Sequence, residues 1–439
     1  MPPSTVAPSP KAGVRRVIAN LLHLLGGKAV AGLLSLVYLV IVTRTLGAAD
    51  YGVLILVNAY AVLLGSIVAF SGFHGVVRYG AQALEEGDVA ALARIVRFMT
   101  VVEIGFGLFA MIVAATLVPL VGPGLGWSSD AMLMAVPYSI AVLATVRATP
   151  QGLLQIAGRF DLIGVHQTIS PIVRLGGALI VWFIGGGLVG FITVWLIASV
   201  VEGVVMWLFG LHAWRRLMAG ERLIGPWRGV LRERGGFGRF ILITNFDITL
   251  RELAPNLAPL TVGWFLGPAA AGLLALAQRA SALLQQPAVL LSQASYAVLA
   301  EQVAKRQFAL LRHTVWRSAQ MAALVAAPIV GILALTGGHL LVLLGGRTFT
   351  GGTTLLILVA IGRLAALASA PIAAGLTALG RPQRSMAVAL FTNLALYPLL
   401  PALLWWIGID GAGWHGLIQS LLAVAILCAF FARDAKRPA

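Results

Sequence analysis

The chain has 439 residues, of which 59% are hydrophobic and only 10% are charged. An ordinary soluble domain of this length is much less apolar, so the composition predicts an integral membrane protein. The net charge of +16 would suggest a nucleic-acid partner in a soluble protein, but in a membrane protein the placement of cations sets orientation instead. We therefore expect no nucleic-acid partner.

The apolar segments are long runs and not short alternating strands, which predicts helices and excludes a barrel. The expected fold class is all-α, a polytopic membrane protein with about 12 transmembrane helices in two six-helix lobes. The expected helices lie near 18–42, 51–72, 95–118, 131–153, 164–184, 188–211, 239–262, 269–299, 313–335, 353–377, 385–407 and 412–431.

The expected organisation has five parts, which follow from these helices and from composition. They are a disordered cytoplasmic N-terminus (1–13), an N-lobe of helices 1 to 6 (14–212), a basic cytoplasmic linker (213–237), a C-lobe of helices 7 to 12 (238–432) and a cytoplasmic tail (433–439). The linker is interpreted as a flexible, solvated join, with a lipid-headgroup site as the alternative.

The 31 Lys and Arg residues are distributed unequally between the two sets of connections. Twenty-three of them fall at the termini and in one set of alternate connections, whereas Arg44 and Arg347 alone fall in the other set. Because cytoplasmic connections carry the excess of Lys and Arg, we expect both termini in the cytoplasm and an even number of helices.

The two halves of the sequence resemble each other. Residues Leu46–Gly52 align with Leu266–Gly272 at a shift of 220, and Gly158-Arg159 aligns with Gly380-Arg381 at a shift of 222. Each half has six helices, so the copies are expected to have the same orientation and to be related by a parallel pseudo-twofold axis. Binding sites in such folds lie between the halves.

The seventh expected helix carries charged groups where hydrocarbon is expected. Asp247 and Arg251 are four residues apart and share a helix face, and Glu252 lies beside them. Pro255 has no N–H for the carbonyl of Arg251, which loosens the backbone at the turn that bears the charge.

The eighth expected helix carries a polar stripe with a spacing of about seven residues. Amide and charged groups in hydrocarbon are costly, so this face is expected to line a polar cavity that binds an anion. Hydrogen bonding between helices is the alternative. The stripe consists of Gln278 with Arg279, Gln285 with Gln286, and Ser292 with Gln293.

Charges within the other expected helices divide into predicted pairs and a surplus of cations. Glu103 with Arg147, and Arg174 with Glu202, match in depth and are predicted ion pairs. Cations with no acid nearby in the sequence are left over, and they are Lys28, Arg279 and Arg363. Lys28 has a second interpretation, in which it extends to the inner interface. By helix rise, Arg251 and Arg279 lie at a similar depth, about 15 Å from the outer face.

Motifs for catalysis and metal binding are absent from the sequence. There is no HExxH, GxSxG or Walker motif, and the seven histidines lack metal-ligand spacing. The single cysteine, Cys428, excludes an intrachain disulfide. We therefore expect no catalytic residue, no metal and no cofactor, and a protein that is not an enzyme.

Short motifs along the chain resemble a known family. Thr43–Gly52 followed by Gly75–Tyr79, then Phe265–Ala277, and finally Leu379–Pro382 are similar to the signatures of Wzx-type polysaccharide and O-antigen flippases. This family belongs to the multidrug/oligosaccharidyl-lipid/polysaccharide exporter superfamily. The resemblance spans essentially the whole chain.

The resemblance implies a transporter of the bacterial inner membrane that moves an undecaprenyl-pyrophosphate-linked oligosaccharide from the cytoplasmic to the periplasmic leaflet by alternating access, for surface polysaccharide biosynthesis. It implies membrane lipid and a polysaccharide polymerase or chain-length machinery as partners. Relatives use cavity cations in the first and seventh helices, which supports Lys28 and Arg251 by position. Asp247 and Glu252 either neutralise Arg251 or couple transport to a proton or cation.

Two other functions remain open at this point. A cation-coupled multidrug antiporter of the same fold would have an excess of carboxylates in its cavity, whereas the surplus here is cationic. A membrane-embedded glycan polymerase, ligase or glycosyltransferase would need a large outer loop with catalytic acids. The outer connections in this sequence are short.

Overall fold

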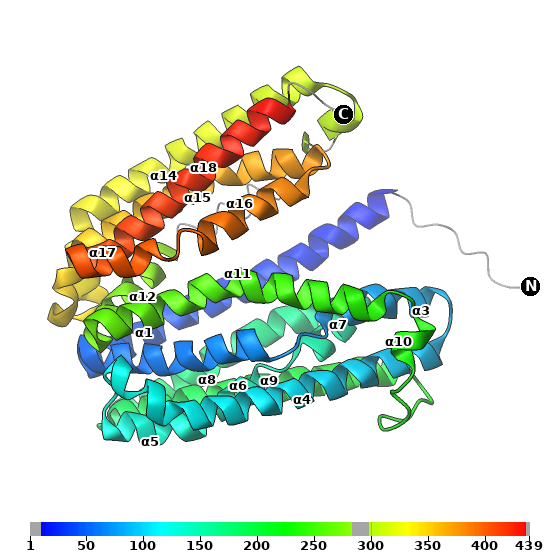
Figure 1. Ribbon diagram of the computed structural model, residues 1–439, viewed down its shortest axis with the longest axis horizontal. Helices are drawn as coiled ribbons and strands as arrows, with labels where there is room; N and C mark the ends of the chain where they lie inside the picture. Colours follow the sequence, from blue (N-terminus) through cyan, green and yellow to red (C-terminus); the bar gives the residue numbers. More distant parts are fainter. Residues whose placement is uncertain (1–9, 283–297, 300, 436–439) are drawn as a thin grey trace, which may run out of the picture. The chain divides into compact units, whose positions relative to one another are not determined.

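The structure is a computed structural model that describes residues 10–282, 298–299 and 301–435, and every regular element in these ranges is a helix (Figure 1). In chain order the helices are α1 (Pro10–Val68), α2 (Phe73–Gly75), η1 (Val76–Gly80), α3 (Ala81–Glu85), α4 (Val89–Val121), η2 (Pro123–Leu125), α5 (Ser129–Tyr138), α6 (Ile140–Ala144), α7 (Ala148–Ile156), α8 (Phe160–Phe183), α9 (Leu188–Leu217), α10 (Val230–Glu233), α11 (Phe237–Leu266), α12 (Pro268–Ala282), α14 (Phe308–Gly345), η4 (Arg347–Gly352), α15 (Thr353–Ala378), α16 (Pro382–Leu394), α17 (Leu399–Ile407) and α18 (Asp410–Asp434). The prediction of an all-α membrane protein is confirmed.

The expected spans can be followed along these helices. Seven described helical segments are long and apolar enough to cross a membrane, and the bent pair α16–α17 would make an eighth. One of the seven contains two expected spans, because the backbone of α1 is not helical at Gly47, with φ 70° and ψ −176°. The helices α8, α11 and α12 coincide with the remaining expected spans but are not among these seven segments. Only the first part of the eighth expected span is described, and α12 has 15 residues.

Backbone turns confirm the internal repeat. A positive φ strongly favours glycine, so such residues mark turns that the chain requires. In this chain they recur at separations of 219 to 223 residues. The pairs are Gly47 with Gly267, Gly87 with Arg306, Gly126 with Gly346, Gly158 with Gly380, and Gly185 with Gly408.

A close backbone contact has the symmetry of this repeat. A Cβ added at Gly52 would lie 1.7 Å from the carbonyl oxygen of Pro268, and one added at Gly272 would lie 2.4 Å from that of Ala48. Residues 48 and 52 correspond to residues 268 and 272 at the shift of 220. Each copy therefore contributes the same two positions to the contact, which a twofold axis requires.

The chain forms two compact units. Unit 1 consists of Met1–Ile41, Leu64–Val118 and Met132–Ile248, and unit 2 consists of Val42–Leu63, Pro119–Ala131 and Thr249–Ala439. In unit 1, α9 packs against α7 and α8. In unit 2, α15 packs against both α14 and α18, and α18 also packs against α17.

Each unit contains a helix that is broken at membrane depth. In unit 1 the chain leaves helical geometry between α6 and α7, at Thr145–Arg147. In unit 2, α16 and α17 meet at an angle of 42° around Pro398. A break frees backbone N–H and C=O groups, which is tolerated in a membrane only where protein or a polar cavity satisfies them. Both breaks lie beside the polar groups described next.

Candidate functional site

Unit 2 contains a polar cavity of about 330 Å³ beside the broken helix α16–α17. Five elements of unit 2 form its wall, namely α11, α12, α15, the α16–α17 pair and α18. Its polar side chains are Gln278, Arg363, Asn393, Tyr397, His415, Gln419 and Ser420, and none of its described lining residues is a carboxylate.

Hydrogen bonds hold most of these polar groups in place. The Nε2 of Gln419 donates to Oδ1 of Asn393 at 2.6 Å and to the carbonyl oxygen of Thr392 at 3.2 Å. His415 Nε2 lies 3.1 Å from the carbonyl oxygen of Leu396, which also accepts a hydrogen bond from the backbone N–H of Leu399 at 3.0 Å. The wall is thus a preorganised set of donors and acceptors, as a binding site needs.

Arg363 differs from its neighbours in the cavity wall. It projects from the middle of α15 and is half-buried, and its guanidinium has no hydrogen bond or ion pair with any residue that the structure describes. A desolvated cation without a counter-charge is costly, so such a group is usually kept for a ligand. A guanidinium can bind an oxyanion through two parallel N–H bonds. The cavity is therefore suited to an anion.

The other expected site residues divide by location. Gln278 lines the cavity with Arg363, whereas Arg279, the next residue on α12, is exposed and does not line it. The predicted stripe residues Gln285, Gln286 and Gln293 lie outside the described residues.

The expected cluster on α11 also lies outside the cavity wall. Arg251 and Glu252 are exposed, Asp247 is half-buried, and Glu252 accepts a hydrogen bond of 3.4 Å from the side chain of Asn256. Neither Asp247 nor Arg251 is without an interaction partner. Lys28 is exposed on α1 in unit 1.

Five polar residues of the cavity were not predicted from the sequence. They come from the eleventh and twelfth expected spans and are Asn393, Tyr397, His415, Gln419 and Ser420. The available signal was their polarity within apolar runs, which is the signal that singled out Arg363. Their separation along the chain hid the fact that they share one wall.

In unit 1 the predicted ion pairs are wrong. Arg147 pairs with Glu202, with an N–O distance of 2.9 Å. Arg174 instead lies over the ring of Trp195 at 4.1 Å and donates a long hydrogen bond of 3.5 Å to the hydroxyl of Tyr38. The prediction matched the residues by depth alone, and depth does not say which way a side chain points around a helix.

Glu103 has a different role, set by the break between α6 and α7. Its carboxylate is buried and accepts hydrogen bonds from the backbone N–H groups of Ala148 at 2.7 Å and Thr149 at 2.8 Å. These N–H groups belong to the first turn of α7, which the break leaves without helical partners. A carboxylate there also complements the positive end of the helix dipole. Glu103 therefore caps a helix and is not part of an ion pair.

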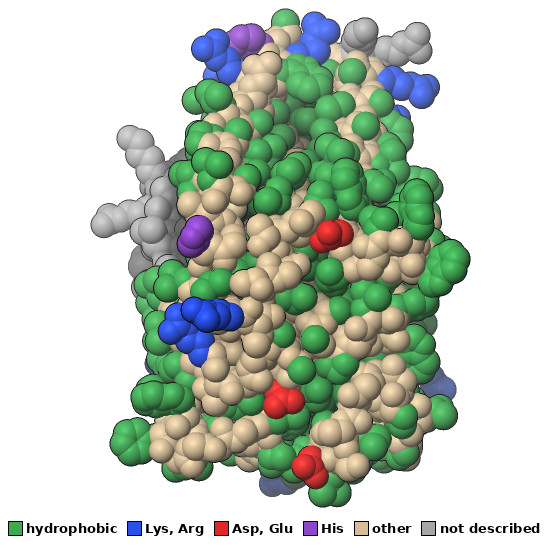
Figure 2. Space-filling model, turned by 90° about the vertical axis from the view of Figure 1, so that its left-hand side faces the viewer, with side chains coloured by type: hydrophobic (Ala, Val, Ile, Leu, Met, Phe, Trp, Pro, Cys, Tyr) green, Lys and Arg blue, Asp and Glu red, His purple; other side chains and the backbone are tan. Residues whose placement is uncertain are grey.

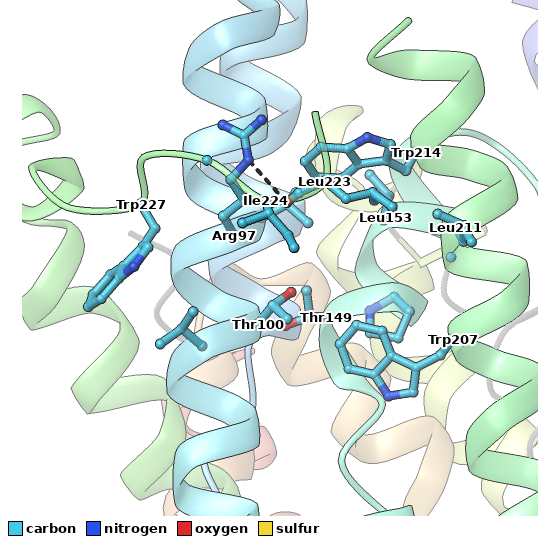
Figure 3. A pocket seen from close by; sticks show the side chains of 15 residues that line it. Arg97, Thr100, Thr149, Leu153, Trp207, Leu211, Trp214, Leu223, Ile224 and Trp227 are labelled. Atoms are coloured by element: carbon cyan, nitrogen blue, oxygen red, sulfur yellow. Dashed lines mark hydrogen bonds between the residues drawn. The ribbon is translucent and has the colours of Figure 1, made fainter. Parts of the chain in front are cut away.

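The basic linker is anchored to unit 1, unlike the flexible join expected from the sequence. Arg97 is one of the twenty-three cations that the sequence analysis placed at the termini and in the cation-rich connections. It is buried on α4 (7% exposed), and it bonds Glu221 at 2.9 Å and the carbonyl of Arg222. Figure 3 shows it beside Leu223 and Ile224, at one end of an apolar pocket of about 380 Å³. The connection folds back over α4. The order of charged residues along the sequence does not reveal this long-range contact.

A second ion pair ties the far end of the linker to the α3 region. Arg234 bonds Glu86 through both carboxylate oxygens, at 3.1 Å and 2.6 Å. These hydrogen bonds lower the pKa of Glu86 below its ordinary value, since they favour the ionised carboxylate.

Comparisons with known proteins agree with this architecture. A family model described as "Polysaccharide biosynthesis protein" matches residues 41–351, well over half of the chain. The chain is 28% identical over 282 residues to the inner membrane protein YghQ of Escherichia coli (strain K12), covering 64% of this chain and 79% of that protein.

Solved structures with the same fold have low sequence identity. An inward-facing multidrug resistance MATE family transporter of the MOP superfamily superposes with a TM-score of 0.71 at 14% identity, over 92% of this chain and 94% of that one. The lipid II flippase MurJ in an inward closed conformation gives 0.72 at 12% identity, over 92% and 86%. A MOP superfamily transporter from Pyrococcus furiosus gives 0.60 at 14%, over 97% and 96%. With its helical repeat and with residues 41–351 matched, the chain belongs to the polysaccharide biosynthesis protein family and has the MOP transporter fold.

Proposed function

We propose that this protein is a flippase that carries an undecaprenyl-pyrophosphate-linked oligosaccharide from the cytoplasmic to the periplasmic leaflet of the bacterial inner membrane, for the synthesis of a surface polysaccharide such as O-antigen. The observation that carries the proposal is Arg363, which has no hydrogen bond or ion pair with any described residue and lies in a cavity whose described wall has no carboxylate. A multidrug antiporter that exports cations would need the opposite polarity there.

The chemistry of the cavity fits the headgroup of such a lipid. A diphosphate presents several anionic oxygens, and the guanidinium of Arg363 can bind two of them side by side in a low-dielectric environment. Sugar hydroxyls can both donate and accept, so the amides of Gln278 and Gln419 and the hydroxyl of Tyr397 are suitable partners for them.

The volume limits how much of the substrate this cavity can hold. At about 330 Å³ it lies at the lower end of the range for small-molecule sites. It is large enough for a diphosphate and the adjoining sugar but not for a whole oligosaccharide or a polyprenyl tail. We therefore assign the cavity to the headgroup.

The cations outside this cavity are proposed to guide the same headgroup. Lys28, Arg251 and Arg279 are exposed on their helices. Alternating access requires different side chains to meet the substrate in different states, so these residues are proposed as transient contacts. Asp247 and Glu252 are proposed as the groups that couple transport to a proton or cation. A polysaccharide polymerase or chain-length machinery would receive the product.

The proposed function is tested by deleting the gene and locating the lipid-linked oligosaccharide. Accumulation on the cytoplasmic leaflet, with loss of surface polysaccharide, is the expected result, and the wild-type gene should restore export. If export continues at the wild-type rate and only sensitivity to cationic drugs changes, the protein is a drug exporter.

A further inference from the structure

A second basic site lies in unit 2, away from the Arg363 cavity. A pocket of about 360 Å³ is lined by Thr43, Arg44 and Gly47 from one turn and by Val342 and residues 345–348 around the end of α14. Arg44 and Arg347 are the two cations that the sequence assigns to the cation-poor connections. Three hundred residues apart in sequence, they line one pocket.

Hydrogen bonds join the two turns into one framework. The hydroxyl of Thr43 donates to the carbonyl oxygen of Leu344 at 2.6 Å, and Nη2 of Arg44 donates to that of Leu343 at 2.8 Å. Both turns pass through glycines with positive φ, Gly47 at 70° and Gly346 at 84°. The framework thus fixes the backbone on both sides of the pocket.

The internal repeat shows that these turns do not need arginine. At the shift of 220, Gly47 corresponds to Gly267 and Gly346 corresponds to Gly126, and all four have a positive φ. In the other pair of turns, the position of Arg44 is occupied by Trp264 and that of Arg347 by Trp127. The paired turns share the positive φ but not the whole conformation, since ψ is 28° at Gly126 and −176° at Gly346. A positive φ at these positions therefore forms beside tryptophan as well as beside arginine, and it does not require the two cations.

The charges of the pocket are largely uncompensated. Arg44 caps the last turn of α14 through Nη2, which leaves further N–H groups on its guanidinium. Arg347 is exposed, and its side chain has no hydrogen bond or ion pair within the described part of the chain. No ion pair joins either arginine to a carboxylate among those residues. Figure 2 shows Lys and Arg side chains in separate groups, together with a few Asp and Glu side chains, on a face that is otherwise mostly hydrophobic or neutral.

We propose that Arg44 and Arg347 form a phosphate-binding site on the exit side of the transporter. Two guanidinium groups can bind a phosphate from two directions, and the hydroxyl of Thr348 supplies a further donor at the same pocket. The placement on the exit side rests on the proposed function and on the expected orientation. The binding itself depends on neither. The phosphate belongs either to the transported lipid diphosphate or to an anionic phospholipid of that leaflet.

The experiment measures binding to the purified full-length protein in nanodiscs of neutral lipid. Inorganic pyrophosphate is titrated by calorimetry, and retained phosphatidylglycerol is counted by native mass spectrometry. Arg347→Gln removes a charge-assisted contact and should weaken binding about ten-fold or more. Arg347→Trp introduces the residue type found at the corresponding position of the other copy, Trp127. It should weaken binding to a similar extent in a protein that remains folded.

Matched controls separate this site from general charge effects. Arg317→Gln removes one exposed cation near the other end of α14 and should leave binding unchanged. The titrations are repeated in the Arg363→Gln background. This substitution removes the guanidinium of the other cavity, so the remaining pyrophosphate binding reports on the Arg44–Arg347 site. Reduced pyrophosphate binding identifies a diphosphate site, and reduced phosphatidylglycerol retention alone identifies a phospholipid site. Unchanged binding of both probes in Arg347→Gln overturns the proposal. A wild-type rate of export in Arg363→Gln would count against the proposed function but not against this site.

Discussion

Replacement of Arg363 by leucine should weaken function and strengthen the fold at once. The guanidinium is half-buried and has no partner among the described residues, so it contributes a desolvation cost without a compensating contact. Removing such a group at a functional site commonly stabilises a protein by about 0.5–2 kcal/mol. Losing a charge-assisted contact to a diphosphate costs about 1.5–3 kcal/mol of binding, or about 10- to 150-fold in affinity.

Arg174→Leu is the matched control, because it removes a guanidinium that does have partners. Its contact with the ring of Trp195 and its hydrogen bond to Tyr38 predict a loss of about 1–3 kcal/mol of stability. The assays are thermal unfolding of the purified proteins, binding of undecaprenyl pyrophosphate in nanodiscs, and export of polysaccharide in a deletion strain. The reasoning is refuted if Arg363→Leu unfolds at a lower temperature, as Arg174→Leu should, and binds the lipid as tightly as wild type.

Three further predictions concern the contacts of unit 1. Glu202→Ala should destabilise the protein by about 1–3 kcal/mol, because it leaves the partly buried Arg147 unpaired, and restoring a carboxylate as Glu202→Asp should recover part of the loss in thermal unfolding. Glu103→Ala should lower the stability by about 1–2 kcal/mol because the cap of α7 is lost, whereas Glu103→Gln should lower it less. Equal melting temperatures for the wild-type protein and both variants would contradict the cap. The pKa of Glu86 is lowered in the folded protein, so its bond to Arg234 is present above the ordinary pKa of 4.5 and is lost as pH falls through the lowered pKa. Proteolysis of the linker should therefore increase only at acidic pH in the wild-type protein. In Glu86→Gln it should be increased already at neutral pH.

The number and order of the helices could be predicted from the sequence because a span needs about twenty apolar residues, and this length is visible in one dimension. The repeat could be predicted because its glycines recur at a nearly constant shift of 220 to 222 residues. The partners of Arg147 and Glu103 could not be predicted. A helix rise gives depth but not the direction of a side chain, and the break before α7, which creates the N–H groups that Glu103 accepts, leaves no clear mark in the sequence.

The candidate site was partly predictable for a similar reason. Arg363 and Gln278 stand out as polar residues in apolar runs, but nothing in their spacing says that they share a wall with His415. Arg279 follows Gln278 directly and so points to another side of α12. Arg97 was misassigned because the linker folds back over it, and such long-range packing is not encoded in local charge.

The repeat also suggests which residues serve the fold and which serve the function. Charges found in one copy alone, such as Arg347, are not needed for the positive φ of the turn, because the corresponding glycine of the other copy has a positive φ beside Trp127. Features found in both copies serve the fold, and Gly52 with Gly272 is the strongest case. Gly52→Ala would place a Cβ 1.7 Å from a backbone oxygen, and Gly272→Ala would place one 2.4 Å from another.

Because backbone atoms cannot rotate away, either glycine substitution should cost more than about 4 kcal/mol and sharply lower the amount of folded protein in the membrane. Gly331→Ala is the control, since a Cβ at this position in α14 meets nothing within 4 Å. Its higher helix propensity should raise stability by about 0.5–1 kcal/mol. Wild-type amounts and melting temperature in Gly52→Ala would mean that the two copies do not meet at these residues, and the twofold relation would lose its most direct support.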